Sequence, residues 1–209
     1  MKDKITNINI FGTDIEPLIQ FNIREVTEKV RKYDVKNVND EIQLERIANS
    51  FADRLFEPLT LSFDRSLAKP DSGSEIFDFN TADKLINKAG GRTMVENKRL
   101  NYVTYFFPYN FDEAVFLYAK IGSGIRHWGS YNVMGQPTIY FFTENELDDA
   151  EIEVIKAKKT ALFDRIEKTI EETKGYVKSK KEELRPIFLE ILKTSFKNNQ
   201  KRLELNSKL

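Results

Sequence analysis

"NYVTYFFPYNFDEAVFLYAKI", residues 101–121, is the stretch that decides the fold class of this chain. It contains two runs rich in aromatic and β-branched side chains, which favour strands, and the segment 108–112 separates them. We therefore predict a β-hairpin with a turn of moderate length. Further strands are predicted at 137–144 ("PTIYFFTE"), at 76–79 and at 93–95. Together they indicate a small, mainly antiparallel β-domain.

Two amphipathic helices are predicted before this β-domain. Residues 13–33 carry apolar side chains at helical spacing, and residues 44–55 repeat the pattern after a break and a cap at 37–40. We expect these two helices to pack on each other or on the sheet.

The segment between the second helix and residue 91 is less regular. Residues 59–63 alternate between apolar and polar side chains, which is typical of a half-buried strand. Residues 64–91 are mostly loop, because Ser, Asp, Gly and Asn dominate them, and they include one helical stretch at 82–89. Gly90 and Gly91 are expected to close that helix.

The last third of the chain, from residue 147, carries apolar residues that step by threes and fours. This pattern predicts one long helix or a helical hairpin. Pro186 either kinks a continuous helix or opens a second one, and we favour the kink. We expect self-association, a partner protein or an effector domain to cover the apolar seam of this arm. The seam residues are Ile155, Leu162, Ile166, Ile170, Val177, Leu184 and Ile191.

Charge is unevenly distributed along this arm. Residues 174–209 carry ten Lys or Arg against four acids, and residues 147–173 carry eight acids against five bases. These opposite charges suit antiparallel pairing of two copies or a folded-back hairpin. Nucleic-acid binding through the basic end is a second interpretation, but we do not favour it, because no aromatic platform is interleaved with the lysines.

Composition narrows the classes of function. The 209 residues include 33 basic and 33 acidic side chains, so there is no global attraction to nucleic acid or to an anionic membrane. With no cysteine and one histidine, the chain lacks material for thiolate catalysis, for cysteine-ligated or multi-histidine metal sites and for a catalytic triad. We therefore expect no cofactor and no metal. No apolar run is long enough for a signal or a membrane span, so we expect a cytoplasmic protein without a membrane partner.

The segment "KIGSGIRHWGSYNVMGQP", residues 120–137, contains the only histidine and the only tryptophan. Its glycines resemble a phosphate loop, but the lysine and the following helix of such a loop are missing. One interpretation is a binding mouth in which Trp128 stacks on a ligand while Arg126 and His127 meet an anion. The other, which we favour, is a loop that connects strands, with Trp128 over the core edge and His127 exposed.

A weaker catalytic candidate is formed by Asp71, Glu96 and Lys98, which match the bare PD…ExK pattern of metal-dependent nucleases. In such enzymes two acids hold Mg²⁺ while the lysine positions a water molecule. The chemistry needs residues 96–98 on a core strand with Asp71 beside it. We expect residues 95–99 to be too polar for that strand and Asp71 to lie in a flexible loop.

Four stretches together resemble a known arrangement: "FADRLFEPLTLSFD" (51–64), "YVTYFFPYNFDEAVFLY" (102–118), "PTIYFFTENELDDAEIEVIKAKK" (137–159) and "LRPIFLEILKTSFKNNQKRLELNSKL" (184–209). They are similar to the N-terminal region of large uncharacterised prokaryotic proteins. In these a β-domain and a long helix precede a further domain, in some cases a Toll/interleukin-receptor-like one, in settings that suggest antiviral defence. The resemblance runs from about residue 55 to the end, and it implies no site residue because none of its motifs is catalytic.

The sequence therefore predicts an α+β chain in three segments: N-terminal helices (1–56), a β-rich domain (57–146) and a long helical arm (147–209). The expected function is that of a non-catalytic sensor or oligomerisation module in a prokaryotic antiviral defence protein. The alternatives are a Mg²⁺-dependent nuclease and a nucleic-acid-binding arm.

Overall fold

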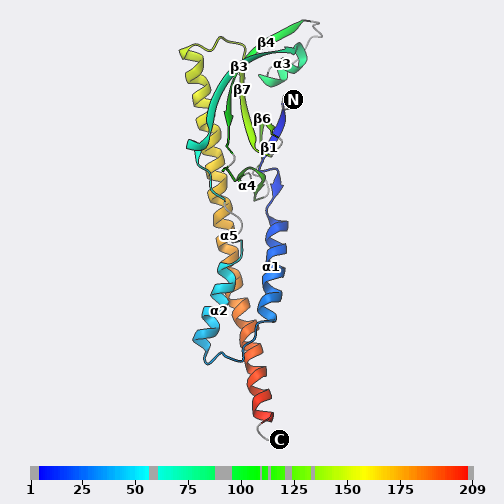
Figure 1. Cartoon of the computed structure of the whole chain (residues 1–209), viewed down its shortest axis with the longest axis vertical. Coiled ribbons are helices and arrows are strands. Elements are labelled where there is room, and N and C mark those ends of the chain that lie inside the picture. The colour runs from blue at the N-terminus through cyan, green and yellow to red at the C-terminus, as the bar shows by residue number, and fades with distance from the viewer. Residues whose placement is uncertain are drawn as a thin grey trace. The chain divides into compact units, whose positions relative to one another are not determined.

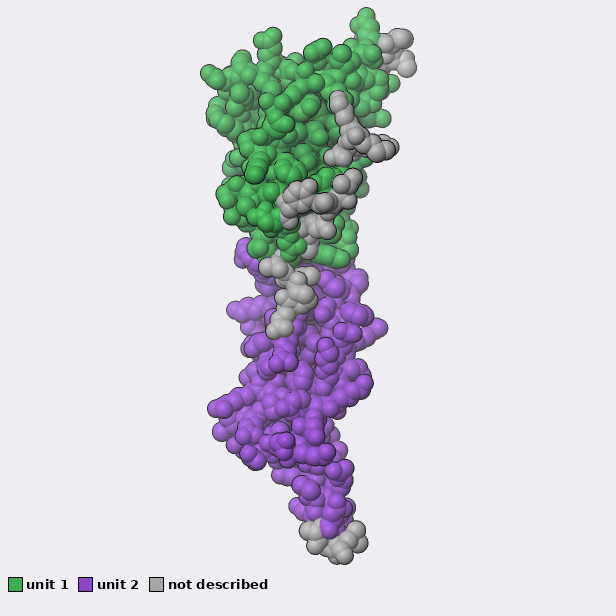
Figure 2. Space-filling model, viewed as in Figure 1, with its two compact units in different colours: residues 1–13, 61–170 green, residues 14–60, 171–209 purple. Residues whose placement is uncertain are grey.

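The chain has the predicted α+β architecture: an antiparallel five-stranded sheet, N-terminal helices and one long C-terminal helix. It divides into two compact units, unit 1 (1–13 and 61–170) and unit 2 (14–60 and 171–209), shown in Figure 2. Each unit thus combines segments that are far apart in the sequence. The structure is a computed structural model that describes residues 5–56, 61–87, 96–108, 110–112, 114–120, 124–132 and 135–206.

The sheet belongs to unit 1, and its strands run in the order β1-β6-β7-β4-β3, each antiparallel to its neighbours (Figure 1). Its central strand β7 is therefore flanked by β6 and β4. The short strands β2 and β5 form a separate two-stranded pair. The strands are β1 (Thr6–Ile10), β2 (Thr13–Asp14), β3 (Lys69–Asp78), β4 (Asn97–Phe106), β5 (Tyr118–Ala119), β6 (Ile125–Tyr131) and β7 (Pro137–Thr143).

Strand β3 confirms the strand predicted at 76–79 as far as Asp78, and it extends that strand back to Lys69 through residues that were predicted as loop. A 3-10 helix, η1 (Arg65–Leu67), is followed by ten residues of strand that pair with β4 from Lys69↔Phe106 to Asp78↔Asn97. The composition of β3 is poor for a strand, but its edge position tolerates Pro70 and leaves polar side chains in water. Pairing with the strongly β-forming β4 outweighs local propensity here.

The predicted hairpin over 101–121 is wrong in its second half. Strand β4 pairs with β3 and β7, and the chain beyond it forms a short helix, α4 (Ala114–Leu117), and then β5. The reason is burial. The side chains of Phe107, Phe111 and Phe116 pack against one another in one buried aromatic cluster, and a straight strand could not bring all three together.

The predicted helices are present as α1 (Glu16–Arg31), α2 (Glu41–Asp53) and α3 (Phe79–Leu85). Asp40 caps α2 as expected, accepting a hydrogen bond from the backbone N–H of Gln43 at 2.8 Å. Helix α3 begins and ends earlier than predicted, and Asn87 (φ 56°) takes the left-handed conformation after it, whereas Gly90 and Gly91 lie outside the described residues.

Two strand predictions are not supported by described residues. Residues 61–63 form no strand, while residues 59–60 and the predicted strand at 93–95 lie outside the part that the structure describes.

The long helix, α5 (Asp149–Asn206), is continuous through Gly175 and Pro186, so the helical-hairpin alternative is wrong. It supplies residues 149–170 to unit 1 and 171–206 to unit 2. Among the described residues, no helix combines the length and apolarity that a membrane span requires.

An aromatic cluster joins α5 to the rest of unit 1. The ring of Phe63 lies 5.3 Å from that of Phe163 on α5 and 5.9 Å from those of Phe107 and Phe116. Phe163 is fully buried and also contacts Tyr105 of β4. At the edge of this cluster Arg65 forms ion pairs with Asp164 at 2.7 Å and Glu167 at 2.5 Å. Figure 1 shows this part of α5, in yellow, alongside the strands.

The apolar seam of α5 is largely covered by the chain itself, which corrects the expectation that another surface must cover it. Five seam residues are buried and two, Val177 and Ile191, are partly exposed. The buried ones are Ile155, Leu162, Ile166, Ile170 and Leu184.

In unit 2, α1 and α2 accompany residues 171–206 of α5. Arg185 pairs with Asp53 at 2.9 Å, and Lys193 pairs with Glu41 at 2.8 Å. The Tyr176 hydroxyl donates to the carboxylate of Glu16. The sequence predicted that the basic half of α5 would face acids of a second copy or of the first half of the arm. In the structure, α1 and α2 supply acidic side chains that face it. The two ion pairs are accessible to solvent and contribute little. Unit 2 is therefore stabilised mainly by its buried apolar side chains, which include Leu44, Ala48, Leu184, Phe188 and Leu192.

Replacement of Phe163 by alanine is expected to destabilise unit 1 by about 3–5 kcal/mol, because it leaves a cavity at the centre of the aromatic cluster. Urea unfolding followed by circular dichroism measures this. Phe21→Ala, the same change at a side chain that is 60% exposed, serves as the control and should cost far less. Equal effects of the two substitutions would contradict the assignment of Phe163 to the core.

Two glycines should respond to alanine in opposite directions. A Cβ at Gly175 meets no atom within 4 Å, so Gly175→Ala should stabilise α5 by about 0.5–1 kcal/mol. A Cβ at Gly129 would lie 2.5 Å from Ile8 Cδ1 and 2.7 Å from the backbone oxygen of Thr138, so Gly129→Ala should destabilise the sheet. Thermal unfolding of both variants checks this, and stabilisation by Gly129→Ala would show that the close approach is absent.

Candidate functional site

The candidate site lies where two neighbouring strands of the sheet, β6 and β7, separate from each other. The ladder between β6 and β7 runs from Tyr131↔Pro137 to Gly129↔Ile139, although β6 continues to Ile125 and β7 to Thr143. Beyond that last pair, β6 remains paired with β1 and β7 with β4. The sheet therefore opens between residues 126–128 and residues 140–142.

A cavity of about 290 Å³ occupies this opening. Strands β6 and β7 supply most of its wall, the end of α3 and Asn7 of β1 supply more, and Lys158 comes from α5. Its size is at the lower limit of small-molecule sites. The lining residues are Asn7, Leu85, Ile86, Asn87, Arg126, His127, Trp128, Tyr140, Phe141, Phe142 and Lys158.

His127 is largely buried in this wall. Its ring centroid lies 4.8 Å from that of Phe141, and its side chain is hydrogen-bonded to the backbone of Tyr140. Nε2 is buried and has no hydrogen-bond partner among the described residues, so Nδ1–H is the donor to the Tyr140 carbonyl. Burial lowers the pKa of His127, and the hydrogen bond to Tyr140 only partly opposes this. The imidazole is therefore neutral near pH 7, and Nε2 is an acceptor.

Aromatic side chains give the cavity flat apolar walls. Tyr140 and Phe142 lie with their rings 5.6 Å apart and 12° from parallel. Trp128 and Tyr140 also pack against the buried cluster of Leu100 and Phe142.

Two cationic side chains complete the lining. Neither Arg126 nor Lys158 forms an ion pair with a carboxylate of the described residues, and no Asp or Glu lines the cavity. The lining therefore combines two cationic side chains with aromatic faces and contains no acid, although Lys158 helps to lower the pKa of Glu151, a carboxyl group outside the cavity.

The structure brings Arg126, His127 and Trp128 together, but on a strand rather than in the favoured connecting loop, and it buries most of His127 instead of exposing it. Their role in ligand binding stays a prediction. Lys158, Tyr140 and Asn87 had no local signal in the sequence, because only the sheet and α5 together bring them to this place.

The arrangement required for a nuclease is absent. Asp71 pairs with Thr104 and Lys98 pairs with Phe77, so six residues of β4 separate the two positions. At about 3.3 Å per residue this is about 20 Å, too far for one metal site. Lys98 instead forms ion pairs with Asp83, at 3.2 Å, and with Glu144, while Glu96 is exposed just before β4. The described residues contain no group of three or more His, Cys, Asp or Glu side chains that could hold a metal ion.

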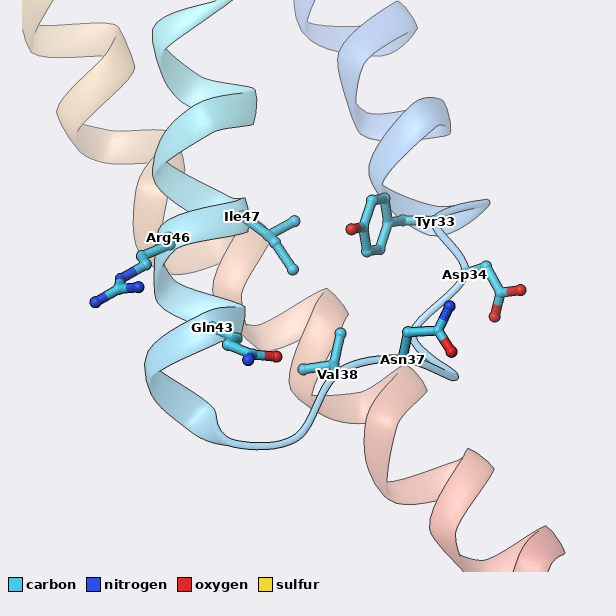
Figure 3. Close-up of a pocket in the computed structure, with 7 residues that line it drawn as sticks. All are labelled: Tyr33, Asp34, Asn37, Val38, Gln43, Arg46 and Ile47. Carbon is cyan, nitrogen blue, oxygen red and sulfur yellow. The ribbon is translucent and has the colours of Figure 1, made fainter.

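A second hollow, of about 320 Å³, lies between α1 and α2 in unit 2. Tyr33, Val38 and Ile47 face one another there, whereas Arg46 extends outward beyond α2 and Asp34 lies on the far side of the connecting loop (Figure 3). Because its charged groups do not converge, this hollow is a weaker candidate than the cavity of unit 1.

Comparisons of the chain with protein-family models, with curated proteins and with solved structures gave no match.

The pKa of His127 can be tested directly, because it is the only histidine of the chain. Its ring proton resonance should titrate with a pKa below the ordinary value of 6.5. Since the pKa in the folded state is the lower one, the unfolded state binds more protons as the pH falls below 6.5. The free energy of unfolding should therefore decrease from pH 7 towards pH 5 by more in the native chain than in His127→Gln. A titration at or above pH 6.5 would show that the imidazole is solvated.

Proposed function

We propose that this chain is a non-catalytic sensor module that binds a small molecule in the cavity between β6 and β7. The observation that carries the proposal is the coincidence of three features in one opening of the sheet. These are the cationic side chains Arg126 and Lys158, the lack of an acidic side chain in the lining, and the exposed part of the sole tryptophan, Trp128. A few polar groups in a mainly aromatic cavity are typical of ligand sites.

The same lining argues for binding without turnover. General acid–base catalysis needs a proton donor or acceptor whose orientation and charge a second group controls. His127 is bonded to a backbone carbonyl rather than to a carboxylate, and no acidic residue lines the cavity. A ligand held here meets groups that recognise it but no pair that would activate a water molecule.

Helix α5 offers a route by which binding could act elsewhere. Lys158 belongs to α5, and the same helix supplies residues 171–206 to unit 2. In the proposal, the sensor is cytoplasmic and precedes an effector domain, as the resemblance to prokaryotic defence proteins implies for that domain. Self-association or an effector contact would use exposed apolar residues of α5 such as Ile187, Leu203 and Leu205, because the predicted seam is mostly buried.

Metabolite extracts, freed of protein, from phage-infected and uninfected bacteria provide a test. Fluorescence of Trp128 should change reversibly with at least one extract, and mass spectrometry should find no metabolite consumed. Arg126→Gln should remove the response, whereas Arg24→Gln on α1 should retain it. The proposal fails if neither extract changes the fluorescence, or if a metabolite is converted by the chain but not by His127→Gln.

A further inference from the structure

We infer that the opening between β6 and β7 takes the C-terminal end of a short extended peptide, which enters as an additional strand with its carboxylate foremost. The inference rests on the proposed function, because it names the class of small molecule that the sensor would bind. It follows from the backbone groups at the edges of the opening, from the faces to which the lining side chains point, and from the charge of those side chains.

The backbone of β7 alternates between its two neighbouring strands. The carbonyl of Pro137 accepts a hydrogen bond on the β4 side, from the residue that follows β4. Because successive residues of an antiparallel strand direct their N–H and C=O groups to opposite sides, the backbone groups of Tyr140 and Phe142 point towards β6. Continuing the register past its last pair places Arg126 and Trp128 opposite them, with backbone groups directed towards β7.

Several of these backbone groups have no strand to pair with. The carbonyl of Tyr140 accepts the hydrogen bond from the side chain of His127 and not one from the backbone N–H of Trp128. Among the described residues, no strand pairs with that N–H or with the groups of Arg126 and Phe142 that face the opening. An extended peptide placed between the two edges would satisfy them, as in other cases of strand addition.

The lining side chains point to both faces of the sheet. His127 and Phe141 pack together on the face that α5 covers, where Lys158 also lies. Arg126 and Trp128 lie on the opposite face, where α3 packs, because side chains of a strand alternate. A compact ligand on one face would meet only one of these groups. An extended peptide directs successive side chains to alternate faces, so it would contact both.

The carboxylate is specified by the two cations of the lining. Arg126 belongs to one face of the sheet and Lys158 to the other, and no acidic side chain lines the cavity. The end of an inserted strand lies in the plane of the sheet, between the two faces, so both cations can approach it. Hydrogen bonds from charged donors to a carboxylate are among the strongest that proteins form, and the backbone N–H of Trp128 is a further donor.

The direction and length of the peptide follow from the shape of the opening. The strands separate towards the first residue of β6 and the last residue of β7. A peptide that enters with its C-terminus foremost therefore runs parallel to β6 and antiparallel to β7. The opening spans about three residues of each strand, or about 10 Å at about 3.3 Å per residue, so it holds about two or three residues of the peptide.

Retention of peptides by the immobilised full chain tests the inference. A pool of N-acetylated tripeptides of mixed sequence with free carboxylates is compared with the same pool as C-terminal amides, and mass spectrometry identifies what is retained. Peptides with free carboxylates should be retained. In calorimetry, the amide of a retained peptide and its analogue with N-methylated peptide bonds should each bind about tenfold or more weakly. The backbone amide resonance of Trp128 should shift when the carboxylate form binds.

Variants then assign the contacts of the carboxylate. Arg126→Gln and Lys158→Gln should each weaken binding of the carboxylate form by about 10- to 100-fold, with little effect on the amide. Lys156→Gln is the matched control on α5, because Lys156 pairs with Glu153 at 2.6 Å and does not line the cavity, and its affinity should be unchanged.

His127 is a positioning residue in this inference, because it occupies the Tyr140 carbonyl and leaves the N–H of Trp128 to the ligand. In His127→Phe the released carbonyl should accept from Trp128 and lengthen the ladder by one pair. Exchange of the Trp128 amide hydrogen with solvent should then become slower, and the affinity for the carboxylate form should fall about tenfold. A general loss of structure would instead make that exchange faster.

The inference is overturned if no peptide with a free carboxylate is retained, if the amide or the N-methylated analogue binds as tightly, or if Lys156→Gln has the same effect as Lys158→Gln. These results differ from a failure of the sensor proposal itself. If the peptides fail while a bacterial extract still changes Trp128 fluorescence, the ligand class is wrong but the sensor remains. If both fail, neither proposal stands.

Discussion

The packing of Phe163 among Phe63, Tyr105 and Phe107 is the interaction on which the rest of unit 1 depends. It attaches α5 to the sheet through buried aromatic edges and faces, a large apolar contribution with a definite geometry. Because a helix is rigid over a few turns, fixing Phe163 also fixes Lys158, five residues earlier on the same helix. The cationic lining of the cavity thus depends on an apolar contact outside it.

The opening between β6 and β7 is an exception to the regularity of an otherwise well-paired sheet. Separation of two central strands forfeits ladder hydrogen bonds, and the bond from His127 to the Tyr140 backbone replaces part of that loss. Gly129 marks the last pair before the opening, where Ile8 and Thr138 leave no room for a Cβ. Departures from local regularity tend to coincide with functional sites, which is why this opening, rather than the hollow between α1 and α2, supports the proposed sensor.

Unit 2 shows how one charge pattern can be satisfied in several ways. The excess of basic residues after residue 173 suits a second copy, a nucleic acid or an acidic helix equally well. In the structure, Asp53 and Glu41 of α2 form ion pairs with Arg185 and Lys193, respectively. These pairs set which helix faces lie together, while burial of the apolar seam supplies the stability.

The sequence by itself determined the helices α1, α2 and α5 and the strands β4 and β7, because periodicity and β-propensity over these stretches are strong and local. Only the tertiary structure decided that the polar segment 69–75 is a strand, that 114–117 is a helix, and that Asp71 and Lys98 lie far apart. The sequence singled out Arg126, His127 and Trp128 as adjacent residues of unusual type, but not the strand that carries them. Their meeting with Tyr140 and Lys158 depends on strand register and on the docking of Phe163, which are contacts between residues far apart in the chain, and no local pattern encodes them.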